Sequence, residues 1–162
     1  MNDFHFFLRP NAKEFSIYQR CQRSLFPEEF SVVCPDCGGE CIGSEVFNIK
    51  QTPSGLVKYR PYGLPGPFEC KLRCPSCGFN ARQLINWPND AYWKCDVKGK
   101  TLWAWSLEHT NVLLNYIQSQ HRNNRAYPGY YAALVHLPTH FELAKNRKAA
   151  VKSLRKLMIA SH

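Results

Sequence analysis

The sequence predicts an α+β fold in which an antiparallel sheet with an added β-hairpin is followed by a C-terminal helical part. Three observations lead to this prediction. Short apolar runs separated by turn residues fill residues 34–105, the apolar period becomes helical after Ser106, and cysteines stand in two close pairs within the strand-rich part. The 162 residues are 44% hydrophobic and 14% aromatic, which is enough apolar material for a packed core.

The chain divides into three parts that we expect to form one compact unit. Residues 1–33 mix aromatic and charged side chains, residues 34–105 are rich in strand formers, and residues 106–162 have a helical pattern. Within the first part a short helix is expected over about residues 11–24. We expect the aromatic side chains of this N-terminal segment to pack against the body.

Two β-hairpins are predicted in the middle part. The first spans residues 46–59 around the turn "TPSG", which ends at Gly55. The second joins "AYWKCDV" to "TLWAWS" through "KGK", with Gly99 at the bend.

Two helices are predicted in the last part. Ser106 is placed to cap the first, whose apolar side chains recur at Leu107, Leu113 and Ile117. The second begins with a predicted capping box of Thr139 and Glu142, and an apolar rhythm of 3.6 residues continues to Met158.

The cysteine pairs predict a metal site. Both have the form C-P-x-C-G, first at Cys34 and Cys37 and again at Cys74 and Cys77. Two residues between thiolates let both sulfurs reach one ion at about 2.3 Å, and four sulfurs complete a tetrahedron, as zinc prefers. Proline presets φ in such a turn, and glycine allows the positive φ that follows. We therefore predict that these four cysteines bind one zinc ion.

Residues 34–77, with these paired CPxCG motifs, resemble the zinc-ribbon family. Each CPxCG motif is called a knuckle below. The resemblance implies that the two knuckles bind one zinc ion at the end of a small antiparallel sheet. Zinc ribbons bind nucleic acid or protein or staple a tail, so the resemblance specifies fold and metal but leaves function open. A site closed by four thiolates has no position for substrate, which predicts a structural role.

The cysteines of the two motifs lie at positions symmetric about a common midpoint in the sequence, and Cys41 and Cys70 are symmetric about the same midpoint. If the strands that leave and enter the knuckles pair in that symmetric register, these two cysteines face each other. Reduced core thiols are the simplest interpretation, because free cysteine is among the most buried residue types. A cross-strand disulfide and a second metal site that includes Cys21 or Cys95 are the alternatives.

Positive charge concentrates near the C-terminus. The net charge is +9, and residues 106–162 carry eight basic and two acidic residues. On the last helix the predicted outer row consists of Lys145, Lys148, Lys152, Arg155 and Lys156. Such a row suits a nucleic-acid backbone, DNA or RNA, and predicts a non-catalytic accessory or regulatory protein. An adaptor that docks on an acidic protein or a larger enzyme is the alternative, and a solvated helix end that favours cations is the simplest explanation.

Aromatic side chains gather between the knuckles and the helices, and they have two interpretations. Exposed, they would stack on unpaired bases. Buried, they would form the core between ribbon and helices, which their large apolar area favours. The residues are Trp87, Tyr92, Trp93, Trp103 and Trp105.

An enzyme is the third hypothesis. Glu108, His109 and His121 could supply acid–base chemistry, although neighbouring helix residues point about 100° apart and solvated positions explain them more simply. His136 and His140 are four residues apart, but Pro138 separates them, which favours a packing role over a metal pair.

The compartment expected from the sequence is the cytoplasm. No run of about 18 apolar residues is present, and the N-terminus lacks the pattern of a signal peptide, so no membrane association is expected. Reduced thiols in the cytosol also favour metal binding over disulfides.

Overall fold

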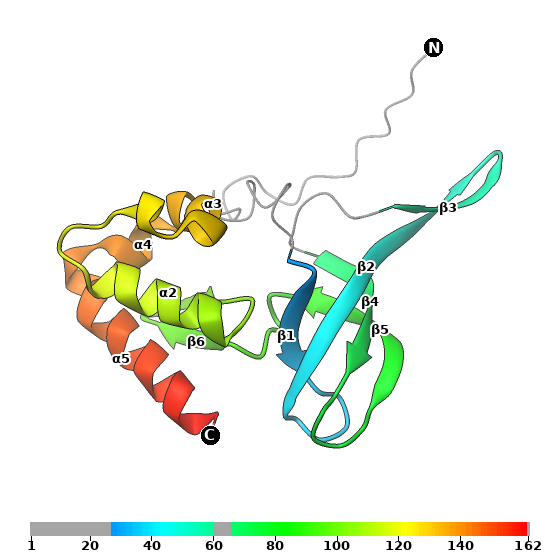
Figure 1. Cartoon of the computed structure of the whole chain (residues 1–162), viewed down its shortest axis with the longest axis horizontal. Helices are drawn as coiled ribbons and strands as arrows, with labels where there is room; N and C mark the ends of the chain where they lie inside the picture. Colours follow the sequence, from blue (N-terminus) through cyan, green and yellow to red (C-terminus); the bar gives the residue numbers. More distant parts are fainter. Residues whose placement is uncertain (1–26, 60–65, 162) are drawn as a thin grey trace, which may run out of the picture.

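The computed structural model describes residues 27–59 and 66–161 (Figure 1). The strands are β1 (Glu29–Val33), β2 (Glu40–Thr52), β3 (Gly55–Tyr59), β4 (Gly66–Arg73), β5 (Asn80–Trp87), β6 (Lys94–Val97) and β7 (Lys100–Trp103). The helices are α2 (Leu107–Gln118), α3 (Tyr131–Val135), α4 (Thr139–Glu142) and α5 (Ala144–Ala160), with short 3-10 turns η2 (Asn124–Ala126) and η3 (Pro128–Tyr130). The predicted helix over residues 11–24 lies outside the described residues.

The predicted α+β class is confirmed. The larger sheet has the antiparallel order β1-β2-β4-β5, with β3 paired to β2, and β6 and β7 form a separate two-stranded sheet. In Figure 1 the larger sheet occupies one side of the molecule and the helices occupy the other, and β6 lies on the helical side, next to α5. Both predicted hairpins are present, with positive φ at Gly55 and at Gly99.

One face of the larger sheet forms the core. Across the β1–β2 pair, Cys41 lies opposite Val32 and Gly43 lies opposite Phe30. All four are buried, and the Phe30 ring covers the Gly43 backbone so closely that a Cβ there would lie 2.6 Å from its Cζ. The sequence at position 43 is therefore constrained by the ring opposite it.

The other face of this sheet is charged. The β2–β4 register shifts between Ser44 and Phe47, and Glu45 within this bulge has φ +49°. Its carboxylate lies 3.8 Å from Lys71 Nζ and 3.5 Å from Arg82 Nη2. These ion pairs are exposed and contribute little stability, but they mark this face as solvated.

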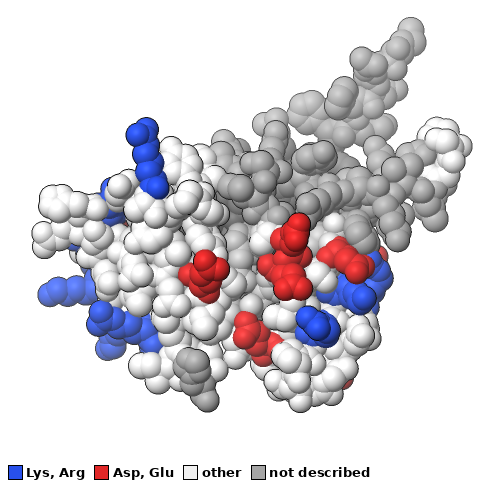
Figure 2. Space-filling view, in the orientation of Figure 1, with Lys and Arg blue, Asp and Glu red and all other residues white. Residues whose placement is uncertain are grey.

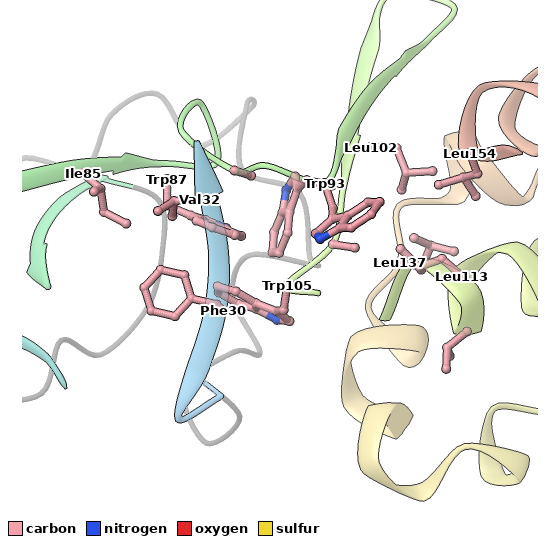
Figure 3. Close-up of a cluster of buried hydrophobic side chains, with 14 of the residues drawn as sticks. Phe30, Val32, Ile85, Trp87, Trp93, Leu102, Trp105, Leu113, Leu137 and Leu154 are labelled. Atoms are coloured by element: carbon pink, nitrogen blue, oxygen red, sulfur yellow. The ribbon is translucent and has the colours of Figure 1, made fainter. Parts of the chain in front are cut away.

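An aromatic layer joins the sheet to the helical part (Figure 3). Trp87 of β5 stacks on Trp105 with ring centroids 4.4 Å apart, and Phe30 of β1 meets both rings edge to face. Trp93 and Trp103 are buried as well, and no tryptophan is more than 5% exposed. Burial, the interpretation favoured by apolar area, is thus confirmed for the four tryptophans, whose rings are not available to stack on bases. Tyr92 is half-buried and meets Trp93 edge to face.

The β6–β7 hairpin is fixed beside α4 and α5 by three hydrogen bonds, two to its backbone and one from a side chain of its own. Ser153 Oγ donates to the Asp96 carbonyl (2.9 Å), and His140 Nε2 lies 2.9 Å from the Val97 carbonyl oxygen. Lys98 Nζ donates in the other direction, to the carbonyl of Lys145 in the first turn of α5 (2.7 Å). The hairpin turn is therefore held at the N-terminal end of α5.

The predicted cap of the first helix is confirmed. Ser106 is the N-cap of α2, and its Oγ accepts a hydrogen bond from the His109 N–H. Val112, Leu113, Tyr116 and Ile117 face the core. α2 begins directly after the aromatic layer, because Ser106 follows Trp105.

The predicted capping box is wrong. Thr139–Glu142 is a separate helix, α4, and Leu143 in extended conformation (ψ 136°) separates it from α5. The physical reason is a tertiary one. The Glu142 carboxylate accepts from Tyr116 Oη at 3.2 Å and lies 3.7 Å from Arg122 Nη1, so it does not turn back to cap a helix.

No helix in the described part of the chain is long and apolar enough to cross a membrane.

Gly43→Ala is predicted to destabilise the protein by about 1–3 kcal/mol, the usual cost of overpacking. The added methyl group would meet the Phe30 ring, which is itself held between other rings and has little room to move. Chemical denaturation followed by circular dichroism measures the change. Gly129→Ala is the matched control, because a Cβ there meets nothing within 4 Å. Equal stability of the two variants would contradict the prediction.

Candidate metal centre

Two similar turns place the paired cysteines at one end of the larger sheet. The first turn joins β1 to β2, and the second joins β4 to β5. In each, the glycine after the second cysteine has positive φ, +72° at Gly38 and +79° at Gly78, and its N–H donates to the carbonyl of the first cysteine. The C-P-x-C-G motif therefore forms the same tight turn twice.

The four sulfurs meet at one point. The Sγ atoms of Cys34, Cys37, Cys74 and Cys77 all lie within 4.8 Å of one another. Cys34 and Cys77 sulfurs are 3.6 Å apart, as are those of Cys37 and Cys74. Tetrahedral ligands with metal–sulfur bonds of about 2.3 Å lie about 3.8 Å apart. The donor set thus fits a tetrahedral ion bound by four thiolates.

Backbone amides favour the thiolate form at one of these sulfurs. The N–H groups of Cys77 and Ser76 point at the Cys74 sulfur and lower the pKa of this thiol to about 6. Thiolates are the form that binds metal, so such amides assist ligation.

Glu40 connects this cluster to the interior. Its carbonyl oxygen lies 3.7 Å from the Cys74 sulfur, and its carboxylate accepts hydrogen bonds from Ser31 Oγ (2.5 Å) and from Trp93 Nε1 (2.9 Å). The first knuckle is therefore tied to β1 and to the segment that leads into the β6–β7 hairpin.

The symmetric register predicted for Cys41 and Cys70 is wrong. β2 pairs with β4 as Ile42 opposite Arg73 and Gly43 opposite Leu72. Cys41 instead lies opposite Val32 on β1, and Cys70 lies opposite Gln83 on β5. Each knuckle turns its own hairpin, so the symmetry between the knuckles does not set the pairing of β2 with β4.

Both thiols are nevertheless buried and free, as the simplest interpretation predicts. Burial is the main cause that raises the pKa of Cys41, and likewise of Cys70, to about 12. Neither belongs to a disulfide, and in the described part of the chain Cys95 joins no second cluster of metal-binding side chains. Cys21 lies outside the described residues.

The candidate acid–base residues are not brought together. His109 is fully buried, its Nδ1 accepts a hydrogen bond from the Trp105 N–H, and its ring stacks on Tyr130. Glu108 and His121 are exposed, but Glu108 lies in the first turn of α2 and His121 follows the end of that helix. His140 has a packing role, since its ring bonds to Val97 and Asn146.

The five predicted basic side chains are all exposed on α5. Lys148, Lys152, Arg155 and Lys156 line an open groove along this helix together with Val151 and Ile159. In Figure 2 lysine and arginine project from the outer edge of the helical part, whereas aspartate and glutamate lie nearer the centre of this face. The opposite side of α5 buries Asn146, Ala150 and Leu154.

Comparison with protein-family models, with curated proteins and with solved structures finds no match to this chain.

Cys37→Ser is predicted to remove the bound metal and to lower thermal stability, because a three-sulfur site holds the ion less tightly and the ion contributes folding free energy. Elemental analysis should give about one ion per wild-type chain and clearly less for the variant. Cys95→Ser is the control, since this half-buried thiol lies outside the cluster. Wild-type protein without metal, or with two ions, would contradict the four-sulfur assignment.

Acid should destabilise the protein through His109, whose pKa burial lowers from 6.5 to about 3. The unfolded chain then binds the proton that the folded chain does not, so stability is full above pH 6.5 and falls progressively toward pH 3. Between pH 7.5 and 5.5 this histidine should account for a loss of about 1.4 kcal/mol.

Denaturation at several pH values measures this loss. His109→Asn keeps a hydrogen-bond acceptor for the Trp105 amide and should flatten the pH dependence by that amount, whatever its effect on stability at pH 7.5. The exposed His121→Asn is the control and should leave the slope unchanged. Identical slopes for wild type and His109→Asn would contradict the assignment.

Proposed function

We propose that the protein is a non-catalytic, zinc-stabilised accessory or regulatory protein that binds nucleic acid through the outer face of α5. The proposal has two parts, the bound metal and the nucleic-acid partner, and a different feature supports each. The four-sulfur cluster supports the metal, and the cation row of α5 supports the partner.

Zinc is proposed because four thiolates in tetrahedral arrangement are its usual structural ligand set. Four protein sulfurs leave no open coordination position, so the ion would hold the two knuckles together instead of activating water. The resemblance of residues 34–77 to zinc ribbons agrees with this role. The metal would then stabilise the end of the larger sheet where the two knuckles lie. This is the end opposite the β2–β3 hairpin.

The observation that carries the nucleic-acid proposal is the distribution of charge on α5. Its 17 residues include six basic and no acidic side chains. Lys145, Lys148 and Lys152 succeed one another at spacings of three and four residues, where like charges repel by about 0.2–0.5 kcal/mol per pair. The row therefore costs stability in the isolated protein.

The helix dipole does not explain this row. Cations are stabilised at a helix C-terminus, but the last turn of α5 contains no basic residue and the first turn contains no acidic one. Lys145 lies in the first turn, and Lys98 brings a second ammonium to the same end. Arg155 donates to Gln118 Oε1 at 3.2 Å, but the helix dipole does not favour the row, so a polyanionic ligand explains it better than the dipole does.

Nucleic acid is the polyanion proposed because its phosphates repeat regularly. Along the axis of α5 the positions of Lys148, Lys152 and Arg155 succeed one another about every 4.5–6 Å, at about 1.5 Å per residue, and their long side chains can reach successive phosphates of a strand. Each cation placed on a phosphate releases a condensed counterion, which favours binding at low salt.

The test is binding of fluorescent DNA and RNA by Lys148→Gln/Lys152→Gln between 50 and 300 mM salt. Loss of two phosphate contacts should weaken binding and reduce the slope of log affinity against log salt by about 1.8. Glutamine is a good helix former, so α5 should persist.

Lys71→Gln/Arg73→Gln is the matched control, with the same change of net charge on the outer face of β4. It should leave the slope unchanged. An equal loss in both variants would show that net charge alone drives binding. Absence of binding at 50 mM salt would refute the proposal and favour the adaptor for an acidic protein.

A further inference from the structure

The β6–β7 turn lies beside the cation row of α5, and this placement extends the proposed binding surface. We infer that Lys98 and Lys100 of this turn form, with α5, one composite surface that binds the backbone of double-stranded nucleic acid. The inference rests on the proposed function and deepens it, because it names a second element of the surface and the class of ligand.

The turn is held in place rigidly enough to act with α5. Lys98 donates to the carbonyl of Lys145, and Ser153 donates to the carbonyl of Asp96, so the C-terminal end of β6 and the turn that follows it are tied to the helix. Within the turn, Asp96 Oδ1 accepts from the Gly99 N–H, and Lys98 itself has φ +52°. The turn therefore has a defined shape next to the first turn of α5.

Charge is nearly all of one sign on these two elements. The hairpin contributes Lys94, Lys98 and Lys100, whereas Asp96 is its one acidic residue and α5 has none. Lys98, Lys100 and Lys145 are exposed, so the positive surface continues from the turn onto the helix. Lys98 uses one N–H on Lys145 and keeps two further N–H groups for a phosphate.

The length of this surface suits a duplex. From Lys145 to Lys156 the row extends about 16 Å along the helix axis, and the turn lengthens it at the N-terminal end. A duplex offers phosphates at fixed positions on two strands, which a rigid surface with two elements can contact together.

The side chains that line the α5 groove argue in the same direction, because none of these described residues is aromatic. Proteins that bind single strands without sequence preference stack bases on exposed aromatic rings. The tryptophans of the described residues are buried, and the apolar side chains in the α5 groove are aliphatic, Val151 and Ile159 among them. This face offers phosphate contacts without base stacking, which favours duplex over single strand.

Lys100→Gln tests the composite surface. Lys98 is left intact because it also holds the turn against α5. Anisotropy with a fluorescent 20-base-pair DNA duplex should show affinity about three- to tenfold lower at 100 mM salt and a salt slope reduced by about 0.9. Lys71→Gln, an equal charge change on β4, should alter neither.

The same titration with one strand of that duplex tests the ligand class, and the duplex is expected to bind more tightly at equal salt. Tighter binding of the single strand would overturn the duplex assignment. If Lys148→Gln/Lys152→Gln weakens binding and Lys100→Gln does not, the composite surface is refuted while the proposed function stands. If a polyglutamate peptide binds and neither DNA does, both are refuted.

Discussion

The contact between Trp105 and the core of the larger sheet determines how the two halves of the molecule are arranged. The Trp105 ring stacks on Trp87 and meets Phe30 edge to face, and its carbonyl accepts a hydrogen bond from the Ser31 N–H. The next residue, Ser106, caps α2. Because one short stretch is fixed to the sheet and also begins the helix, the orientation of α2, and of α5 packed on it, follows from this contact.

The candidate metal centre and the cation surface are connected through this core. Glu40 ties the first knuckle to Trp93, which precedes β6, and β6 is in turn bonded to α5 through Asp96 and Ser153. The sulfur cluster and the basic helix lie in different halves of the fold, and buried side chains from Cys34 to Leu154 form one continuous cluster between them. A metal ion that holds the knuckles would therefore stabilise the surface that presents the cations without touching it.

Local chemistry made part of this structure predictable. The C-P-x-C-G turns, the Gly99 hairpin and the Ser106 cap depend on residues within a few positions of one another, and the sequence pattern predicts each of them. Strand β1 (Glu29–Val33) was missed because it buries three consecutive residues, Phe30, Ser31 and Val32, and so shows no alternation of apolar and polar side chains. Two predictions were wrong because residues distant in the sequence determine the outcome. The pairing of Cys41 with Cys70 was wrong because the packing of β2 on β4 sets the register. The capping box was wrong because Glu142 bonds to Tyr116 and Arg122. The position of the β6–β7 turn beside α5 also depends on tertiary hydrogen bonds, those of Lys98 and Asp96, which no sequence pattern encodes.

The electrostatics of α5 show why tertiary packing is needed for its surface to exist. A helix whose solvent face carries a row of lysines, with a further ammonium at its N-terminal end, is intrinsically disfavoured. Burial of Ala150 and Leu154 and the hydrogen bond from Ser153 to β6 offset that repulsion. The rest of the fold thus holds cations close together in fixed positions, where they would otherwise separate. Because folding has already brought these cations together, the anionic ligand proposed above would gain the attraction of the assembled row and would relieve the repulsion as well.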